Sequence, residues 1–317
     1  MKSLTIAIPT YKSEQTLFRL LESILLSPNS QGVVSEVLIS DNDPDSEIRQ
    51  NLESKYSDQI WQNIRYIKNE TNLGYDGNLA NLAYESTSEI TKFIADDDLV
   101  TDNFFKSMER ILSSEVDFDI ILHNFQGVSD SGEFRPDPIF LPENFLKLSP
   151  EWRYEQIISL EGKFGQISSL AFKTNRIRDL VPKIRTNFIH LFWFYSILET
   201  STIIFEQKPT IIVVLGSPNF SKTKIEVLTV PRGAILALEH SQLRNSSLRK
   251  SLLLDATNYC LNLLKDCVTL RKHDRVKVIR HFRKELMRSP LMAVKLVPYF
   301  VTPSAVYGFF SQYLKEK

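Results

Sequence analysis

The chain has 317 residues, of which 43% are hydrophobic and 24% are charged. This composition is typical of a soluble globular protein with one large domain or two smaller ones. It includes no run of about 18 uninterrupted apolar residues, which excludes a predicted transmembrane helix. The N-terminal residues become polar too early for a signal peptide, so we expect the protein in the cytoplasm.

The net charge of zero hides an uneven distribution of charge along the chain. Residues 1–130 hold 10 Lys and Arg against 22 Asp and Glu, whereas residues 131–317 hold 28 against 16. An acidic first part argues against nucleic acid as its ligand, unless a metal ion intervenes. A basic second part favours an anionic partner, such as a membrane surface or a pyrophosphate.

The first 125 residues alternate between strand and helix patterns. Apolar runs rich in β-branched residues predict strands at 4–11, 35–43, 64–70, 91–98 and 118–125. Apolar residues at helical spacing predict helices at 13–27, 45–58, 74–88 and 101–114. Ser13 is the expected N-cap of the first helix. The alternation predicts an α/β fold in which a mostly parallel, Rossmann-like sheet is flanked by helices.

Beyond residue 130 the pattern is less regular. We expect a loop at 129–145, a helix at 151–164, an apolar helix at 187–199, one or two strands within 202–216, and helices from about 233 onward. Cys260 and Cys267 lie on one face of a predicted helix. We interpret these two cysteines as reduced packing residues rather than a disulfide.

Three of the predicted strands end in polar clusters, namely Pro9-Thr10-Tyr11, Asp41-Asn42-Asp43 and Asp96-Asp97-Asp98. Ligands of parallel sheets bind beyond the carboxyl ends of the strands, so we expect the three clusters to meet at one edge. Carboxylates gathered there predict a site for Mg²⁺ or Mn²⁺ that leaves positions for a diphosphate. The alternative is that the three aspartates only cap the helix that begins near Thr101.

Four segments resemble the family-2 glycosyltransferases of the GT-A fold in residues, order and spacing. They are "IAIPTYKSEQTLFRLLESIL", "EVLISDNDPDS", "NETNLGYDGNLANLAYESTS" and "KFIADDDLV". The last two are most similar to the abequosyltransferase-like and rhamnosyltransferase-like branch, which builds bacterial surface polysaccharides such as O-antigen and capsule. The resemblance is firm over residues 4–125, thinner to about 215 and absent beyond it.

The resemblance implies a GT-A catalytic domain at 1–225, and from the residue pattern we expect a basic, amphipathic helical region at 226–317. It also implies a nucleotide-diphosphate sugar as donor, held by Pro9, Thr10, Tyr11, Asp41, Asp43, Gly74, Asn78, Asp96 and Asp97. For Asp41 and Asp43 the alternative is an ordinary strand-ending turn. Gly74 and Asn78 have the alternative of a plain turn and an ordinary helix residue.

The same resemblance assigns Asp96 and Asp98 to the Asp-x-Asp motif of the family. This motif coordinates Mn²⁺ or Mg²⁺ and, through the ion, the diphosphate of the donor. Lys12 or Glu14 would lie near the nucleotide. A weaker match places three residues beneath the donor sugar, namely Gly165, Gln166 and Ser168.

Family members generally invert the anomeric centre and use an Asp at the start of a helix in the second half as general base. This sequence departs from the pattern, because the matching helix "NFIHLFWFYSILETS" has no acid at its start. Aligning the end of that helix puts His190 at the position of the Asp, and a neutral histidine suits the task. The alternative is a core or acceptor-pocket histidine, in which case the base is Glu143, Glu161 or a water-relayed acid.

The window 265–290 carries nine Lys and Arg and three acids, and an apolar segment rich in aromatic residues follows it. A basic helix followed by such a segment suits the surface of an anionic leaflet. We therefore expect peripheral contact with the inner face of the cell membrane, where the acceptor would be a lipid-linked glycan. The alternative is a helical subdomain that packs on the catalytic core.

Together these features predict a metal-dependent, inverting transferase that moves a hexose or deoxyhexose to a lipid-linked oligosaccharide in O-antigen or capsule synthesis. A nucleotidyltransferase is less well supported, because the loop after the first strand lacks the glycines that hold a triphosphate. A non-catalytic sugar- or nucleotide-binding relative is the other alternative. The missing acid at the position of His190 favours that alternative, and the intact run Asp96–Asp98 argues against it.

Overall fold

The computed structural model describes residues 1–56, 62–129, 134–135, 166–215, 232–263, 276, 279–280 and 282–288. The helix expected at 151–164, most of the basic window at 265–290 and the apolar segment after it lie outside this part of the chain. So do Glu143, Glu161, Gly165, Cys267 and the side chain of Cys260. No helix among the described residues has the length and apolar character needed to cross a membrane.

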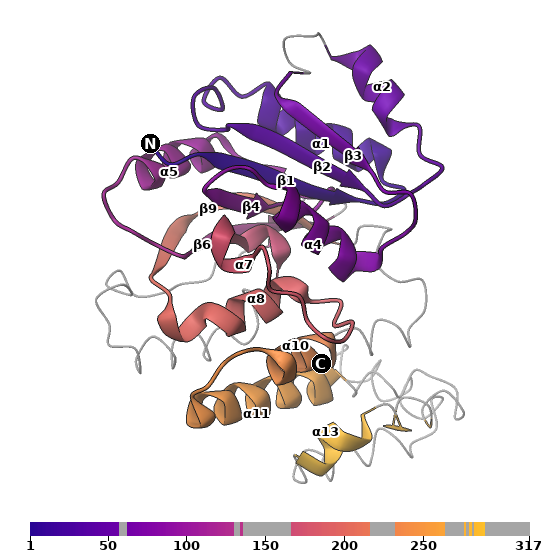
Figure 1. The fold of residues 1–317 in the computed structure, drawn as a ribbon, viewed down its shortest axis with the longest axis vertical. Coiled ribbons are helices and arrows are strands. Elements are labelled where there is room, and N and C mark those ends of the chain that lie inside the picture. The colour runs from indigo at the N-terminus through magenta and orange to yellow at the C-terminus, as the bar shows by residue number, and fades with distance from the viewer. Residues whose placement is uncertain are drawn as a thin grey trace, which may run out of the picture.

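Nine strands of the described chain form one sheet (Figure 1). They are β1 (Leu4–Thr10), β2 (Glu36–Asp41), β3 (Ile64–Lys68), β4 (Ile90–Phe93), β5 (Leu99–Val100), β6 (Ile120–Ser129), β7 (Phe134–Arg135), β8 (Leu170–Lys173) and β9 (Ile203–Leu215). Their spatial order is β3-β2-β1-β4-β8-β6-β9-β5, with β7 beside β6. The pairs β1–β2, β2–β3, β1–β4 and β6–β9 are parallel, whereas β8, β5 and β7 run antiparallel to their neighbours. The prediction of a mostly parallel sheet is therefore confirmed.

Helices cover both faces of this sheet, as the alternating pattern predicts. The helices of the described chain are α1 (Glu14–Leu25), α2 (Ile48–Lys55), α4 (Gly74–Glu85), α5 (Asp102–Leu112), α7 (Thr174–Ile177), α8 (Ile189–Ile197), α10 (Arg232–His240), α11 (Ser246–Leu263) and α13 (Arg283–Arg288). Two short 3-10 helices, η3 (Ile167–Ser169) and η4 (Leu198–Thr200), precede β8 and follow α8. Helix α10 packs against α8 on the side away from the sheet, and α11 packs against α10 (Figure 1).

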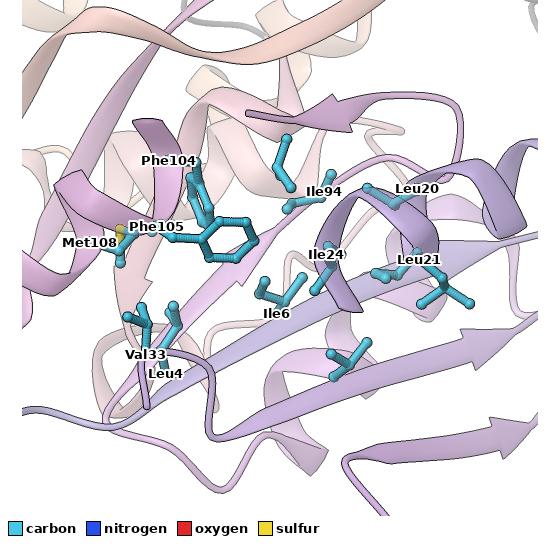
Figure 2. Packing of buried hydrophobic residues seen from close by; sticks show 14 of the residues in the cluster. Leu4, Ile6, Leu20, Leu21, Ile24, Val33, Ile94, Phe104, Phe105 and Met108 are labelled. Carbon is cyan, nitrogen blue, oxygen red and sulfur yellow. The ribbon is translucent and has the colours of Figure 1, made fainter. Parts of the chain in front are cut away.

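The sheet has a hydrophobic core on each face, because successive side chains of a strand point to opposite sides. Figure 2 shows one core, in which Ile6 of β1 packs with Leu20 of α1 and Phe104 of α5. On the other face Ala7 belongs to the core that α4, α8, α10 and α11 complete, with the buried Trp193 within it. Both faces are thus covered. The edge where the strands end is therefore the place where a polar ligand can bind.

Some details differ from the expectations. The strand predicted at 91–98 ends at Phe93, so Asp96–Asp98 lie in the loop between β4 and β5. Ser13 precedes α1 as predicted, but its hydroxyl donates to the carbonyl of Tyr11 and forms no cap. The single strand β9 fills the region 202–216, because it pairs with the whole length of β6 around an irregularity at His123.

Candidate functional site

The polar ends of β1, β2 and β4 meet where the strand order changes direction. The chain builds β1, β2 and β3 outward on one side and then returns to place β4 on the other side of β1. Thr10 lies opposite Asp41 in the β1–β2 register. The Thr10 hydroxyl also donates a hydrogen bond of 2.6 Å to Asp96, which follows β4. The prediction that these clusters converge is confirmed for Thr10, Asp41 and Asp96, at the position where open α/β sheets bind ligands.

Asp96 accepts the hydroxyl of Thr10 at the end of β1. Burial of its carboxyl raises the pKa to about 7, and the charge of Asp97 adds to this effect. Hydrogen bonds from the hydroxyls of Thr10 and Ser13 and from the main chain of Tyr11 act in the opposite direction without cancelling the rise. Lost hydration therefore destabilises the charged form of this carboxyl, and a bound cation would relieve that cost.

Asp98 lies deeper, with 3% of its surface exposed. Ser168 donates its hydroxyl to one carboxylate oxygen, and the amide of Val214 in β9 donates to the other at 3.3 Å. Burial followed by the charge of Asp97 raises the pKa of Asp98 to about 7. Both partners lie outside α5, and the residue at the start of that helix is Thr101. Nothing in this bonding pattern favours the reading in which the aspartates serve as helix caps.

The donor set at this edge fits a hard divalent cation only in part. Within the described ranges, no group of three His, Cys, Asp or Glu side chains gathers closely enough to hold a metal ion. Mg²⁺ and Mn²⁺ commonly take one or two carboxylates and complete their shell with water and substrate phosphates. Asp96 and Asp98 are carboxylates of that kind, and a cation with a diphosphate at this edge stays a prediction.

Asp41 is the last residue of β2 and is completely buried. The hydroxyl of Tyr66 donates to one of its oxygens, and the amide of Asp43 donates to the other at 2.9 Å. Burial and the bond to Asp41 raise the pKa of Tyr66. The turn expected as the alternative reading is therefore present, and Asp43 is the more exposed of the two aspartates. The structure leaves the nucleobase role of both residues a prediction.

Buried amides join the end of β2 to the start of α4. Asn69 donates to the side-chain oxygens of Asn42 and Asn78, at 3.2 and 3.1 Å. Asn78 donates to the carbonyl of Ser40 at 3.0 Å, and Asn42 accepts the amide of Leu73 at 2.9 Å. Such networks hold a loop in one conformation when every member is bonded. The sequence reasoning singled out Asn78 and overlooked the rest, although asparagines crowd the segment from 69 to 81.

Gly74 begins α4 in the left-handed region, with φ +70°. A Cβ atom there would lie 2.5 Å from the guanidinium of Arg185, which donates to the carbonyl of Leu73. The left-handed conformation favours glycine at this turn, whereas the flexible end of Arg185 could move to make room for a Cβ atom. The turn of the alternative reading is therefore present at Gly74, and a role of this residue in nucleotide binding stays a prediction.

The start of α8 is held by a carboxylate from another element. Asp76 of α4 accepts the amides of Thr186, Asn187 and Ile189, the last two at 2.9 and 3.2 Å, and also the Thr186 hydroxyl at 3.1 Å. Asn187 adopts φ 58°, a left-handed conformation that Asn tolerates better than most residues with a side chain. The sequence did not indicate this role of Asp76, because the residue belongs to α4 and not to α8 or the residues just before it.

His190 is the second residue of α8 and is 2% exposed. Its Nδ1 atom is 3.1 Å from the hydroxyl of Tyr75, and the two rings meet edge to face at 5.9 Å. Burial raises the pKa of Tyr75, and the charges of Asp76 and Asp98 raise it further. This hydroxyl is therefore within electrostatic reach of the Asp98 loop. The role of His190 as general base remains a prediction, and the residue is buried as the alternative of a core histidine expects.

The loop after β1 carries the exposed side of the site. Tyr11 is 45% exposed, and the amine of Lys12 lies 5.3 Å from the centre of its ring. Lys12 has φ 55°, the left-handed conformation that side chains other than glycine, Asn and Asp rarely adopt. Pro9 is partly buried within β1, beside Ser40 of β2. An exposed aromatic ring and a cation at the end of a strand suit a nucleotide, which stacks its base and carries phosphate charge.

A buried lysine lies beneath this edge and was also missed. Lys92 of β4 is completely buried, and its amine donates to the carbonyl of Ser168 at 2.5 Å. Burial holds the pKa of Lys92 well below its ordinary value. The signal in the sequence was a charged residue inside the apolar run from Ile90 to Ile94.

The sequence profile of glycosyl transferase family 2 matches residues 5–173. This match spans every strand that contributes a polar cluster to the edge described above. No curated protein sequence matches the chain at a significant level.

Solved structures of S. aureus TarS share the fold. A crystal structure of TarS residues 1–349 with UDP-GlcNAc has a TM-score of 0.57 at 14% identity, covering 98% of this chain and 92% of that chain. The same part of TarS with UDP has a TM-score of 0.55 at 15% identity, covering 98% and 91%. A longer TarS structure has a TM-score of 0.53 at 15% identity, and the match covers 94% of this chain and 54% of that one.

Proposed function

The chain belongs to glycosyl transferase family 2, and from that premise we propose that it transfers a hexose or deoxyhexose from a nucleotide-diphosphate sugar to a lipid-linked glycan. The observation that carries the proposal is the meeting of Thr10, Asp41 and Asp96 at the point where the strand order changes direction. The desolvated carboxyls of Asp96 and Asp98 add an oxygen-rich position for a cation at that edge.

The donor side of the proposal rests on complementary charge. A nucleoside diphosphate that departs from the anomeric carbon gathers negative charge on its phosphate oxygens. A Mn²⁺ or Mg²⁺ ion held by Asp96 and Asp98 would stabilise that charge. Tyr11 and Lys12, exposed beside these acids, would face the nucleotide, and Asp43 would lie near its base or ribose. The UDP and UDP-GlcNAc complexes of TarS support a uridine nucleotide as the first donor to test.

The acceptor side of the proposal centres on α8. An acceptor hydroxyl must lose its proton as it attacks, and His190 is the ring of α8 that bonds to Tyr75, whose pKa the charge of Asp98 raises. The hydroxyl of Tyr75, 3.1 Å from Nδ1, would orient the ring of His190 for that proton transfer. Asp76 accepts the amides at the start of α8, and we call this set of hydrogen bonds the Asp76 clamp. The clamp would hold the ring of His190 in place.

The finer assignments rest on the sequence. The segments "NLGYDGNLANLA" and "ADDD" support a place in O-antigen or capsule synthesis, in the abequosyltransferase-like and rhamnosyltransferase-like branch. The nine Lys and Arg at 265–290 support peripheral contact with the inner face of the cell membrane, where a lipid-linked acceptor would lie.

One observation favours a second candidate, a non-catalytic sugar- or nucleotide-binding relative of the same fold. No acid begins α8, and the histidine that would replace it is 2% exposed. Such a relative would bind the donor without turning it over.

Thermal stabilisation by UDP, GDP, dTDP and CDP, each with and without Mn²⁺, tests the donor proposal. A ligand that binds only the folded state raises the melting temperature by mass action. We expect one nucleotide to give a shift that is larger with Mn²⁺ and is absent in Asp98→Ala. No shift with any nucleotide would remove the donor assignment. A shift without hydrolysis or transfer of the matching nucleotide sugar, in the presence of a lipid-linked acceptor, would support the second candidate.

A further inference from the structure

We propose that Lys92 is a positioning residue for Asp98, acting through both ends of Ser168. The inference rests on the proposed donor site and extends it to a side chain that no ligand would touch.

The buried position of Lys92 is unfavourable for an amine. Lys92 occupies β4 between Thr91 and Phe93 and has no exposed surface. Its amine lies 6.0 Å from the ring of Phe104, which also packs against the buried His123. Removing a lysine amine from water is unfavourable, and an unbranched apolar residue such as methionine would fill the same space without that cost. The chain keeps an amine there, so the hydrogen bond that this amine makes is the feature to explain.

The amine of Lys92 is connected to Asp98 through Ser168. Its bond of 2.5 Å goes to the carbonyl of Ser168 in η3. The hydroxyl of the same serine accepts the amide of Ala95 at 2.9 Å and donates to Asp98. One residue therefore links the lysine at its main chain to the carboxylate at its side chain, and it also anchors the loop that leads from β4 to the aspartates.

The surroundings of Lys92 also affect the charge of its amine. Burial holds the pKa of Lys92 well below its ordinary value, which favours the neutral amine, while the charge of Asp98 acts in the opposite direction. Either form of the amine can donate to the carbonyl of Ser168, so the hydrogen bond rather than the charge carries the positioning role. Groups that orient a metal ligand from behind are usually worth a factor of about 10 to 100 in metal affinity.

The test compares Lys92→Met with a matched change on the same strand. Thr91→Val alters a buried side chain of β4 that bonds to Ser86 and Thr174 at 2.8 Å and does not contact Ser168. We measure the affinity of UDP at saturating Mn²⁺, and the melting temperature without ligand, for both variants in the full chain. We expect Lys92→Met to weaken UDP about 10-fold or more and Thr91→Val to change it less than about 2-fold, whatever either does to the melting temperature.

A double variant tests the route through the serine. If Lys92 acts through Ser168, the pair Lys92→Met with Ser168→Ala binds UDP no more weakly than Ser168→Ala alone. Additive losses, or an unchanged affinity in Lys92→Met, would overturn the proposal. Should Lys92→Met fail to fold, Lys92→Gln carries the same comparison, because its shorter side chain keeps a polar group but does not reach the carbonyl.

A crystal structure of the ligand-free Lys92→Met variant separates this inference from the proposed function. If the wild type binds no nucleotide, the proposed function fails, and the positioning role is still read from the coordinates. We expect the carboxylate of Asp98 to leave the Ser168 hydroxyl in the variant. An Asp98 that keeps this bond and its orientation would overturn the inference.

Discussion

Asp76 and Asp98 are two buried carboxylates within electrostatic reach of the same tyrosine, Tyr75, yet their surroundings are opposite. Asp76 receives three main-chain amides and one hydroxyl at the start of α8. Asp98 receives one hydroxyl and one amide, and burial beside Asp97 raises its pKa to about 7. A carboxylate that accepts four hydrogen bonds fixes the chain, whereas one that accepts two keeps lone pairs for a cation. In this pair the number of donors therefore separates the structural acid Asp76 from the proposed ligand Asp98.

The largest effect is expected when the structural acid is changed. Asp76→Asn keeps the size of the side chain but turns an acceptor into a donor that faces main-chain amides. Hydrogen bonds to charged groups are worth about 1.5–3 kcal/mol each, so we expect a loss of about 3 kcal/mol in the free energy of unfolding. Chemical denaturation measures this loss.

Glu206→Gln is the matched control for that change. Glu206 is also buried and accepts Ser107, Arg110 and the amide of Lys208, but it lies on β9 beside α5. We expect both variants to lose stability and to keep Mn²⁺-dependent nucleotide binding at temperatures where they remain folded. An Asp76→Asn protein as stable as the wild type would show that the clamp does not hold α8.

A second change tests the clamp from the side of the C-terminal helices. A Cβ atom on Gly233 of α10 would lie 2.1 Å from the carbonyl of Thr186 and 2.5 Å from the ring of Phe188. Gly233→Ala must push α10 away from the start of α8, and overpacking of this kind costs about 1–3 kcal/mol. We expect a lower melting temperature and, since His190 follows Phe188, a lower turnover with unchanged donor affinity. Weaker donor binding in this variant would contradict the separation of the two regions.

The sequence was sufficient for what depends on neighbouring residues and insufficient for what depends on distant ones. Periodicity located β1, β2 and α1 within a few residues, and the motif put Asp96 and Asp98 at the edge where the strands end. The partners of Asp76 and Lys92 lie 110 and 76 residues away along the chain. No local pattern marks such pairs, because they form only when helices and strands pack. For the same reason the sequence could not show that Asp76 of α4 accepts the free amides at the start of α8, a task that a residue just before a helix often performs.

A smaller effect of opposite sign is expected at the proposed ligand. The pKa of Asp98 is about 7 in the folded chain and about 3.9 when unfolded, so the folded state binds more protons between these values. Stability therefore falls as the pH rises through this window when no cation is present. Asp98→Asn removes the charge, and we expect it to be more stable than the wild type by about 1–2 kcal/mol at pH 8, with no gain below about pH 4. A loss of stability at pH 8 would mean that Asp98, like Asp76, is a structural acid.

The smallest effect is expected at the exposed loop of the donor edge. Lys12 and Asn187 both have positive φ, at 55° and 58°. Glycine relieves this strain but makes the unfolded chain more flexible, so Lys12→Gly and Asn187→Gly should each change stability by less than about 1 kcal/mol. We expect only Lys12→Gly to weaken nucleotide binding, by several fold, because only Lys12 lies at the donor edge. Equal effects of the two changes on binding, measured by titration, would contradict this assignment.

Calorimetric titration of Mn²⁺ in the presence of UDP tests the central distinction most directly, with the wild type, Asp98→Asn and Asp76→Asn compared at one temperature at which all three are folded. The account predicts binding of the ion to the wild type and to Asp76→Asn, and loss of that binding in Asp98→Asn. Binding that survives in Asp98→Asn but disappears in Asp76→Asn would contradict it, because the saturated carboxylate would then be the metal ligand.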